Sequence, residues 1–126
     1  MEKIQYELEF IINTSSKLLY TRISTPSGLA EWFADDVKLS SKNYTFFWDG
    51  SEQTAELISK KANDHDKFHW LDDEEGDTYF EFKIEKDELT NDVALIVTDF
   101  AEEDELEESK DLWEQQISEL RRAMGL

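Results

Sequence analysis

The order of strand-like and helix-like segments constrains the fold of this chain most strongly. One alternating strand comes first, two short helical segments follow, then six strand-like segments separated by turn residues, and finally one long amphipathic helix. A sheet of about six or seven strands that is apolar on one face needs a cover, and the last helix is the only predicted element long enough to provide it. We therefore expect an α+β fold in which a curved antiparallel sheet wraps around the C-terminal helix.

The first strand and first helix have clear local signals. Residues 4–12 alternate apolar and polar side chains, which is typical of a strand with one buried and one solvated face. Ser15 or Ser16 can then cap a helix that runs to about Ser24. This pattern predicts a β-α start.

A second short helix follows directly. Thr25 can cap it, and Pro26 fits its first turn, where a backbone donor would have no partner within the helix. Leu29, Trp32 and Phe33 then fall at i, i+3 and i+4, which predicts one apolar face. We expect that face to dock on the sheet.

Turn residues divide the middle of the chain into strands. Asp49-Gly50 is a strong signal for a tight hairpin. The other breaks are a polar turn at 63–66, an acidic turn that ends near 77 and a turn at 90–92. The spacing favours an antiparallel meander, with strands expected at residues 37–39, 44–48, 53–61, 68–71, 78–85 and 93–100.

The last helix is expected to begin near Asp104. Asp104 and Glu107 have the spacing of a capping box. Acidic side chains crowd the first turns and two arginines lie near the end, which suits the helix dipole at both ends. One side of the helix carries an apolar stripe, made of Leu106, Trp113, Ile117, Leu120 and Met124.

Length and charge restrict the classes of function. The 126 residues fit a single domain, residues 1–126. The 13 basic and 31 acidic side chains give a formal net charge of −18. Phosphate backbones and anionic lipid head groups repel such a chain, so we expect neither a nucleic-acid partner nor a membrane partner.

Cysteine usage and the leading residues predict the compartment. The chain has no cysteine, which excludes disulfides, thiol catalysis and cysteine-based metal sites. Its first residues show neither a basic leader nor an apolar signal core, and no apolar run approaches the length of a membrane span. We expect a cytoplasmic protein.

Several local motifs accompany this element order, namely Thr25-Pro26, Leu29, Trp32-Phe33, Trp48-Asp49-Gly50 and Thr98-Asp99-Phe100 before a helix bearing Trp113. In these features the chain resembles the START-like, or helix-grip (SRPBCC, Bet v 1-like), superfamily, and more narrowly the small acidic START-like proteins of Bacteroidetes-type bacteria. That superfamily includes polyketide cyclases and activators of Hsp90 ATPase, of which the resemblance covers only the C-terminal domain. The resemblance implies a helix-grip fold with two short helices after the first strand.

Our main functional hypothesis is a non-enzymatic binder of a small hydrophobic molecule. A curved sheet and a helix seldom fill the space between them completely, and ligand pockets are mostly apolar and concave. Ser109 interrupts the apolar stripe of the last helix and could orient one polar group, and we expect Thr98 opposite it. The alternative is that the same rings fill the interior as core. The expected lining is Trp32, Phe33, Trp48, Trp70, Phe80, Phe82, Ser109 and Trp113.

Two other classes of function stay open. The first is a protein-interaction or chaperone-associated module that uses its acidic surface, as the resemblance to the Hsp90 ATPase activator domain implies. The second is an enzyme of the polyketide cyclase type, although the resemblance transfers no catalytic residue. A monomer and a homodimer are both compatible with the sequence, because the edge strand at 37–39 could pair with a copy while the charge of −18 opposes it.

General acid–base catalysis would need a carboxylate or histidine inside the cavity. Asp35 and Asp36 follow the second short helix and are the best acidic candidates at a cavity mouth. Asp99 is ambiguous, because either face of its strand is apolar enough to point inward. None of the three is predicted to be catalytic.

Metal and cofactor sites are not expected. His65 lies in a polar turn, and His69 should point to solvent if its strand neighbours face the core. No metal-binding motif or third ligand accompanies them. The acidic run at 72–77 lacks the length and spacing of a calcium loop, so we interpret it as a hydrated turn.

Overall fold

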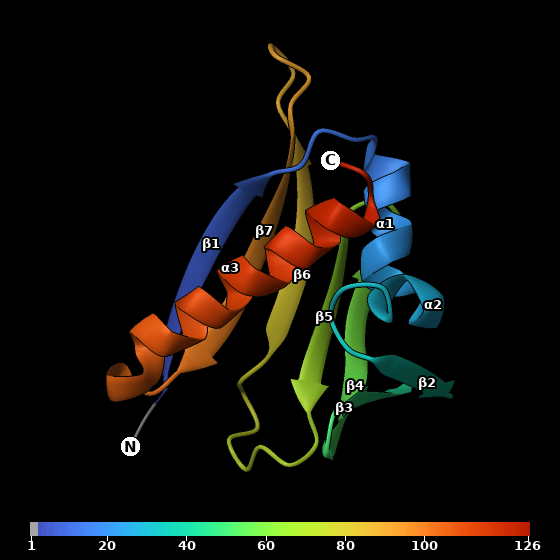
Figure 1. Ribbon diagram of the computed structural model, residues 1–126. Helices are drawn as coiled ribbons and strands as arrows, with labels where there is room; N and C mark the ends of the chain where they lie inside the picture. Colours follow the sequence, from blue (N-terminus) through green and yellow to red (C-terminus); the bar gives the residue numbers. More distant parts are fainter. Residues whose placement is uncertain (1–2) are drawn as a thin grey trace.

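The computed structural model describes residues 3–126 as one seven-stranded antiparallel sheet with three α-helices (Figure 1). The strand order is β1-β7-β6-β5-β4-β3-β2, so the first strand of the chain pairs with the last. The strands are β1 (Ile4–Ile11), β2 (Asp36–Ser40), β3 (Asn43–Trp48), β4 (Ser51–Lys61), β5 (His65–Trp70), β6 (Phe80–Lys86) and β7 (Val93–Ala101). The helices are α1 (Ser16–Ser24), α2 (Pro26–Leu29) and α3 (Leu106–Ala123).

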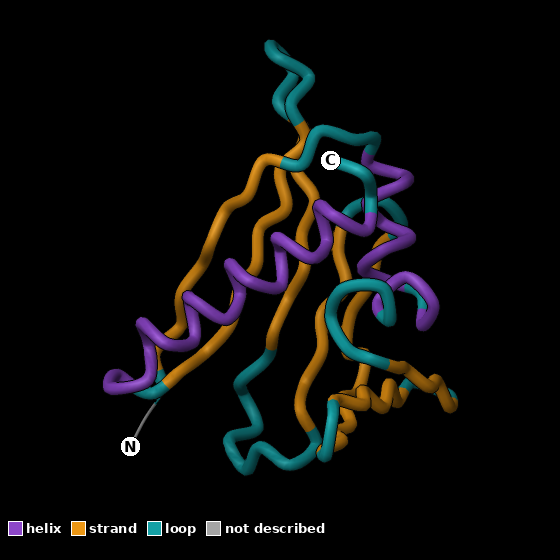
Figure 2. Tube along the Cα trace, in the orientation of Figure 1, coloured by secondary structure: helices purple, strands orange, loops and turns teal. Residues whose placement is uncertain are grey.

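The helices lie against the inner face of the curved sheet. Helix α3 crosses the β1, β7 and β6 side, and α1 and α2 lie beyond its C-terminal end (Figures 1 and 2). Helix α1 contacts β5 and β6, whereas α2 contacts β2. The predicted α+β helix-grip architecture is confirmed. None of the helices within residues 3–126 is long and apolar enough to cross a bilayer.

The two short helices form as the local sequence predicts. The Ser15 hydroxyl accepts a hydrogen bond from the backbone N–H of Leu18 at 3.1 Å. The Thr25 hydroxyl accepts one from the N–H of Gly28 at 2.9 Å. Gly28 also lies against α1 so closely that an added Cβ would be 2.1 Å from the Thr21 carbonyl oxygen. This close approach fixes how α2 leaves α1.

The turn between β3 and β4 is also as expected. Asp49 and Gly50 alone connect the two strands, and Gly50 has a φ of +80°, a backbone region in which glycine has no steric cost. The polar turn predicted at 63–66 is shorter, because β5 already begins at His65. As a result Asp66 is a strand residue on the inner face rather than a turn residue.

The predicted capping box of the last helix is wrong. A 3₁₀ turn, Glu103–Glu105, leads from β7 into α3, and no side chain caps either segment. The N–H of Glu105 instead donates to the carbonyl of Glu102 at 2.9 Å, so the tighter turn satisfies a donor that a cap would otherwise serve. The acids of this turn still lie at the positive end of the helix dipole.

The core is unusually aromatic. Inner-face side chains of neighbouring strands meet in register, as where Phe68 of β5 pairs with Phe80 of β6 and the rings stack with centroids 4.9 Å apart. Helix α3 adds Trp113, Ile117 and Leu120. The fully buried side chains include Phe46, Phe68, Phe80, Phe82, Ile12, Leu19, Ile23, Leu29, Leu95, Val97, Ile117 and Leu120.

Candidate functional site

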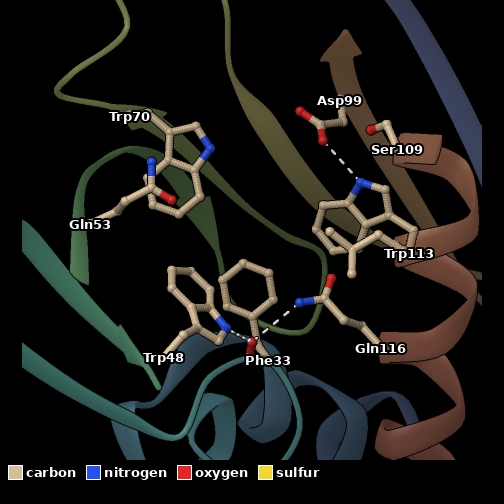
Figure 3. Close-up of a pocket in the computed structure, with 9 residues that line it drawn as sticks. Phe33, Trp48, Gln53, Trp70, Asp99, Ser109, Trp113 and Gln116 are labelled. Carbon is tan, nitrogen blue, oxygen red and sulfur yellow. Dashed lines mark hydrogen bonds between the residues drawn. The ribbon is translucent and has the colours of Figure 1, made fainter. Parts of the chain in front are cut away.

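A half-open pocket of about 370 Å³ lies between α3 and the inner face of the sheet (Figure 3). Exposed side chains, Gln53 of β4 and Leu112 of α3, mark the side that opens to solvent. The volume falls within the usual range of small-molecule sites, about 300–1,000 Å³. The lining consists of Phe33, Trp48, Gln53, Trp70, Asp99, Ser109, Leu112, Trp113 and Gln116.

Phe33 joins the elements that form the pocket. Its ring stacks on Trp113 of α3, with centroids 5.8 Å apart, and meets Trp48 of β3 edge to face at 5.7 Å. Its carbonyl oxygen accepts hydrogen bonds from the Trp48 indole N–H at 2.9 Å and from the Gln116 amide at 3.2 Å (Figure 3). The segment after α2 therefore ties β3 to α3, which holds two indole walls at a fixed separation.

A network of polar side chains joins α3 to β1 and β7 at one side of the pocket. The Trp113 indole N–H donates to Oδ2 of Asp99 at 2.9 Å, and the backbone N–H of Phe100 donates to Oδ1 at 2.8 Å. The Tyr6 hydroxyl lies 3.5 Å from Oδ2 and is hydrogen-bonded to the Ser109 hydroxyl. Burial raises the pKa of the Asp99 carboxyl, although these hydrogen bonds oppose the rise. Burial likewise raises the pKa of Tyr6 to about 12.

Strand register explains which residue of β7 enters the pocket. Asp99 pairs with Tyr6 of β1, whose side chain is buried on the inner face, so Asp99 also points inward. Thr98 pairs with Glu7 and Glu81 and lies on the outer face. Our expectation that Thr98 lies opposite Ser109 is therefore wrong, and Asp99 takes that place.

Five of the eight residues expected at the ligand site line the pocket, namely Phe33, Trp48, Trp70, Ser109 and Trp113. The other three, Trp32, Phe80 and Phe82, are core residues that do not line it. Trp32 turns its indole toward α1, where its N–H donates to the Arg22 carbonyl at 2.7 Å. The rings thus occupy part of the interior and leave part of it open.

Of the remaining lining residues, Asp99 was left ambiguous by the sequence, and Gln53, Leu112 and Gln116 were not expected. Gln116 follows Trp113 by three positions on one helix face, so helical periodicity could have found it. Gln53 pairs with the buried Phe46 across the Asp49-Gly50 turn, so the register of that hairpin could have placed it on the inner face. Asp35 and Asp36 are exposed at the start of β2 and do not line the pocket, so they are not at its mouth.

Acidic side chains flank the pocket on two sides. A hollow that shares Gln53 and Trp70 with the pocket is also lined by Lys3, Asp72, Asp73, Glu74, Glu75 and Glu102. A second hollow shares Ser109 and Leu112 and is also lined by Glu105, Glu108, Asp111 and Gln115. The pocket therefore opens into a region of negative charge.

The acidic loop at 72–77 is held by its own hydrogen bonds. Asp73 accepts them from Lys3 Nζ at 2.9 Å, Thr78 Oγ1 at 2.6 Å and the Glu75 N–H at 3.0 Å. Burial raises the pKa of Asp73, but these bonds outweigh burial and lower the pKa to about 2. Asp73 is thus a structural carboxylate of the loop.

Neither histidine lines the pocket. His65 is hydrogen-bonded to Asp64 at 2.7 Å and to Ser59 at 2.9 Å. His69 lies on the outer face, half-buried, with Nδ1 2.7 Å from the Thr78 carbonyl oxygen. Among residues 3–126, the one group of carboxylates close enough to share a cation is Glu102, Asp104 and Glu105, a cluster outside the pocket in which Glu102 is half-buried and the other two are exposed.

Comparison with known proteins shows which family the chain matches. A family description, START-like superfamily domain, matches residues 1–126. A Bacteroides fragilis protein solved by NMR, BfR322, is 44% identical, with a TM-score of 0.69, and the match covers 100% of this chain and 94% of that one. No curated protein matches the chain.

Two more distant structures share the fold alone. Aha1 from Colwellia psychrerythraea, solved as a dimer, is 17% identical with a TM-score of 0.81, and the match covers 95% of each chain. CalU16 from Micromonospora echinospora is 12% identical with a TM-score of 0.72, and the match covers 94% of this chain and 72% of that one.

Proposed function

The chain belongs to the START-like superfamily, and from that premise we propose that it binds a small, mostly apolar molecule in the pocket between α3 and the sheet. The observation that carries the proposal is the open volume of about 370 Å³ that remains beside a densely aromatic core. At about 30 Å³ for each water, that volume equals roughly a dozen waters. The proposed ligand is therefore small.

The character of the lining supports an apolar ligand with one polar group. Trp48, Trp70, Trp113 and Phe33 offer ring surfaces, whereas Asp99 and Ser109 place polar atoms together at one end. This distribution, many apolar contacts and few polar ones, is typical of small-molecule sites. The hydrogen bonds of Phe33 hold two of the walls before any ligand arrives, which lowers the entropy cost of binding.

Native mass spectrometry and NMR test the proposal together. We expect freshly purified protein to retain a small molecule that denaturation releases. We also expect 4-phenylbutanol, a neutral probe of suitable size, to shift the indole N–H signals of Trp48, Trp70 and Trp113. The indole of Trp32 faces α1 rather than the pocket, so its signal serves as an internal control.

A wall-removing variant makes the test specific. We expect Trp70→Ala to weaken binding of the probe by about tenfold, because one indole wall is lost. Leu18→Ala, on an exposed position of α1, is the matched control. Protein that carries no retained molecule and shows no shift of the pocket indoles with any phenylalkyl probe would contradict the proposal.

One observation favours a second candidate function, general acid or base catalysis by Asp99. Burial raises the pKa of this carboxyl, and such groups in clefts are candidates for proton transfer. Incubation with a metabolite extract, followed by mass spectrometry, should then reveal a conversion that Asp99→Asn abolishes. If no conversion is detected, catalysis by Asp99 is ruled out.

A chaperone-associated role stays a prediction from the resemblance, since the likeness to Aha1 shows the fold alone.

A further inference from the structure

Asp99 is the only charged side chain among the nine that line the pocket. The other lining residues contribute rings, amides, one hydroxyl and one aliphatic side chain. No lysine, arginine or histidine lines the pocket to balance the charge of the carboxylate. Lys3, in the neighbouring acidic hollow, is paired with Asp73 at 2.9 Å, and its charge lowers the pKa of Asp99 less than burial raises it.

The Asp99 carboxylate keeps unused capacity for hydrogen bonds. An ionised carboxylate has about four acceptor sites on its two oxygens. Oδ2 faces the Trp113 indole N–H and, at 3.5 Å, the Tyr6 hydroxyl. Within residues 3–126, Oδ1 accepts one bond, from the N–H of Phe100, which leaves it a second acceptor site. Within residues 3–126, Asp99 forms no ion pair.

The surrounding rings also favour a positive charge. Trp48, Trp70 and Trp113 present indoles to the pocket, and indole is the aromatic group with the strongest cation–π attraction. This attraction is larger when the cation leaves water, as it would inside a half-enclosed pocket. An anionic ligand would instead meet one carboxylate and three electron-rich ring systems.

The acidic side chains of the two neighbouring hollows influence which ligands approach the pocket. The carboxylates of the hollows on both sides, together with the net charge of −18, create a negative potential around the opening. Clefts lined by one sign of charge raise the local concentration of the opposite sign and speed its association. Cations are therefore guided toward the opening, and anions are repelled from it.

We propose that the pocket selects an apolar amine, with its ammonium group beside Asp99 and its hydrocarbon part against the three indoles. This proposal rests on the ligand-binding function proposed above and specifies the chemical class of its ligand. A protonated amine donates to the free acceptor site of Asp99 and neutralises the only charge in the lining. An apolar acid of equal size gains the same ring contacts but faces repulsion from Asp99 and the flanking acids.

Three probes of one shape separate charge from hydrophobicity: 4-phenylbutylamine, 4-phenylbutanol and 4-phenylbutyrate. At pH 8 and low salt, isothermal titration calorimetry should show that the amine binds about tenfold or more tightly than the alcohol. The acid should bind most weakly of the three. The amine should also shift the indole N–H signal of Trp113, whose donor bond ends on Asp99, whereas Trp32 serves as the unshifted reference.

Asp99→Asn tests the role of the carboxylate itself. This change removes the charge and keeps an oxygen that can accept from Phe100. We expect the ratio of amine affinity to alcohol affinity to fall to about one. Asp92→Asn makes the same chemical change at an exposed turn between β6 and β7, and should leave the ratio as in the wild type.

The outcomes distinguish this proposal from the one on which it depends. If the alcohol and the amine bind the wild type equally well, the amine proposal is overturned and the ligand-binding function stands. If none of the three probes binds, the amine proposal is overturned, and the ligand-binding function is overturned with it when the purified protein also retains no molecule. The ratio of amine affinity to alcohol affinity in the wild-type protein tests the amine proposal even if Asp99→Asn does not fold.

Discussion

At the scale of single residues, Asp66 is a buried carboxyl with few partners for its negative charge. It lies on the inner face of β5, only 1% exposed, and Oδ1 accepts a hydrogen bond from the Tyr20 hydroxyl at 2.8 Å. Its other oxygen has no partner within residues 3–126. Burial raises the pKa of this carboxyl to about 6, although the Tyr20 bond and the charges of Lys60 and His65 lower it. The ionised form therefore opposes folding.

We predict that Asp66 makes the protein less stable as the pH rises. A folded-state pKa of about 6, above the ordinary value of 3.8, gives a contribution that is full below 3.8 and lost as the pH rises through 6. Between pH 5 and pH 7 the free energy of unfolding should fall by about 1 kcal/mol more in the wild type than in Asp66→Asn. Urea denaturation at both pH values measures this difference, and parallel pH profiles would contradict it.

The buried position of Asp66 on the inner face could not be predicted from the sequence. Asn63 to Asp66 is dense in turn-forming residues, so local chemistry favours a turn there. Pairing of β5 with β4 and β6 begins at His65 and places Asp66 opposite Phe82 on the inner face. Register, which is set by distant strands, overrides the local preference. The same holds for Asp99, whose direction depends on its pairing with Tyr6.

At the scale of elements, the junction of α1 and α2 determines where Phe33 lies. Gly28 packs on the backbone of α1, and Phe33 follows α2 by one turn, with its N–H bonded to the Leu29 carbonyl at 2.9 Å. Any displacement of α2 therefore displaces the ring that joins β3 to α3. The pocket depends on a contact that lies outside it.

We predict that Gly28→Ala destabilises the protein by about 2 kcal/mol or more, because the new Cβ would lie 2.1 Å from the Thr21 carbonyl oxygen. It should also weaken binding of 4-phenylbutanol. Gly76→Ala is the matched control, since an added Cβ there meets nothing within 4 Å. Thermal unfolding of both variants measures the contrast, and equal melting temperatures would count against this account of the junction.

Helix caps and turns that depend only on neighbouring residues could be predicted from the sequence. Element ends that depend on how one element joins the next were harder to predict. The caps at Ser15 and Thr25 and the Asp49-Gly50 turn need only neighbouring residues, and all three are confirmed. The start of α3 depends on how β7 leaves the sheet. Its 3₁₀ turn therefore replaces the capping box that Asp104 and Glu107 suggest.

At the scale of the whole molecule, the charge of −18 is the largest electrostatic feature. We predict that adding sodium chloride, from roughly 0.01 M to 0.3 M, raises the melting temperature, because salt screens repulsion between the acidic side chains. Differential scanning fluorimetry measures the shift, with sucrose at matched osmolality as the control. A melting temperature that falls with salt would show that attractive pairs dominate instead.

The layer order of the molecule could be predicted, but its interior volume could not. Hydrophobic periodicity indicates that α3 covers the sheet, and the structure confirms this arrangement. Whether the rings fill the space depends on the direction of each side chain. Trp32 turns away toward α1 and Trp113 toward Asp99, and no pattern in the sequence distinguishes the two.

The pairing of β1 with β7 has a consequence for how the chain is made. Ile4 pairs with Ala101, so β1 leaves the ribosome well before β7 and cannot pair with it until the residues between them have been synthesised. Until then its hydrogen-bonding edge stays available to other chains. Contacts so distant in sequence also slow folding. The edge of β1 therefore stays exposed in the nascent chain until β7 has left the ribosome.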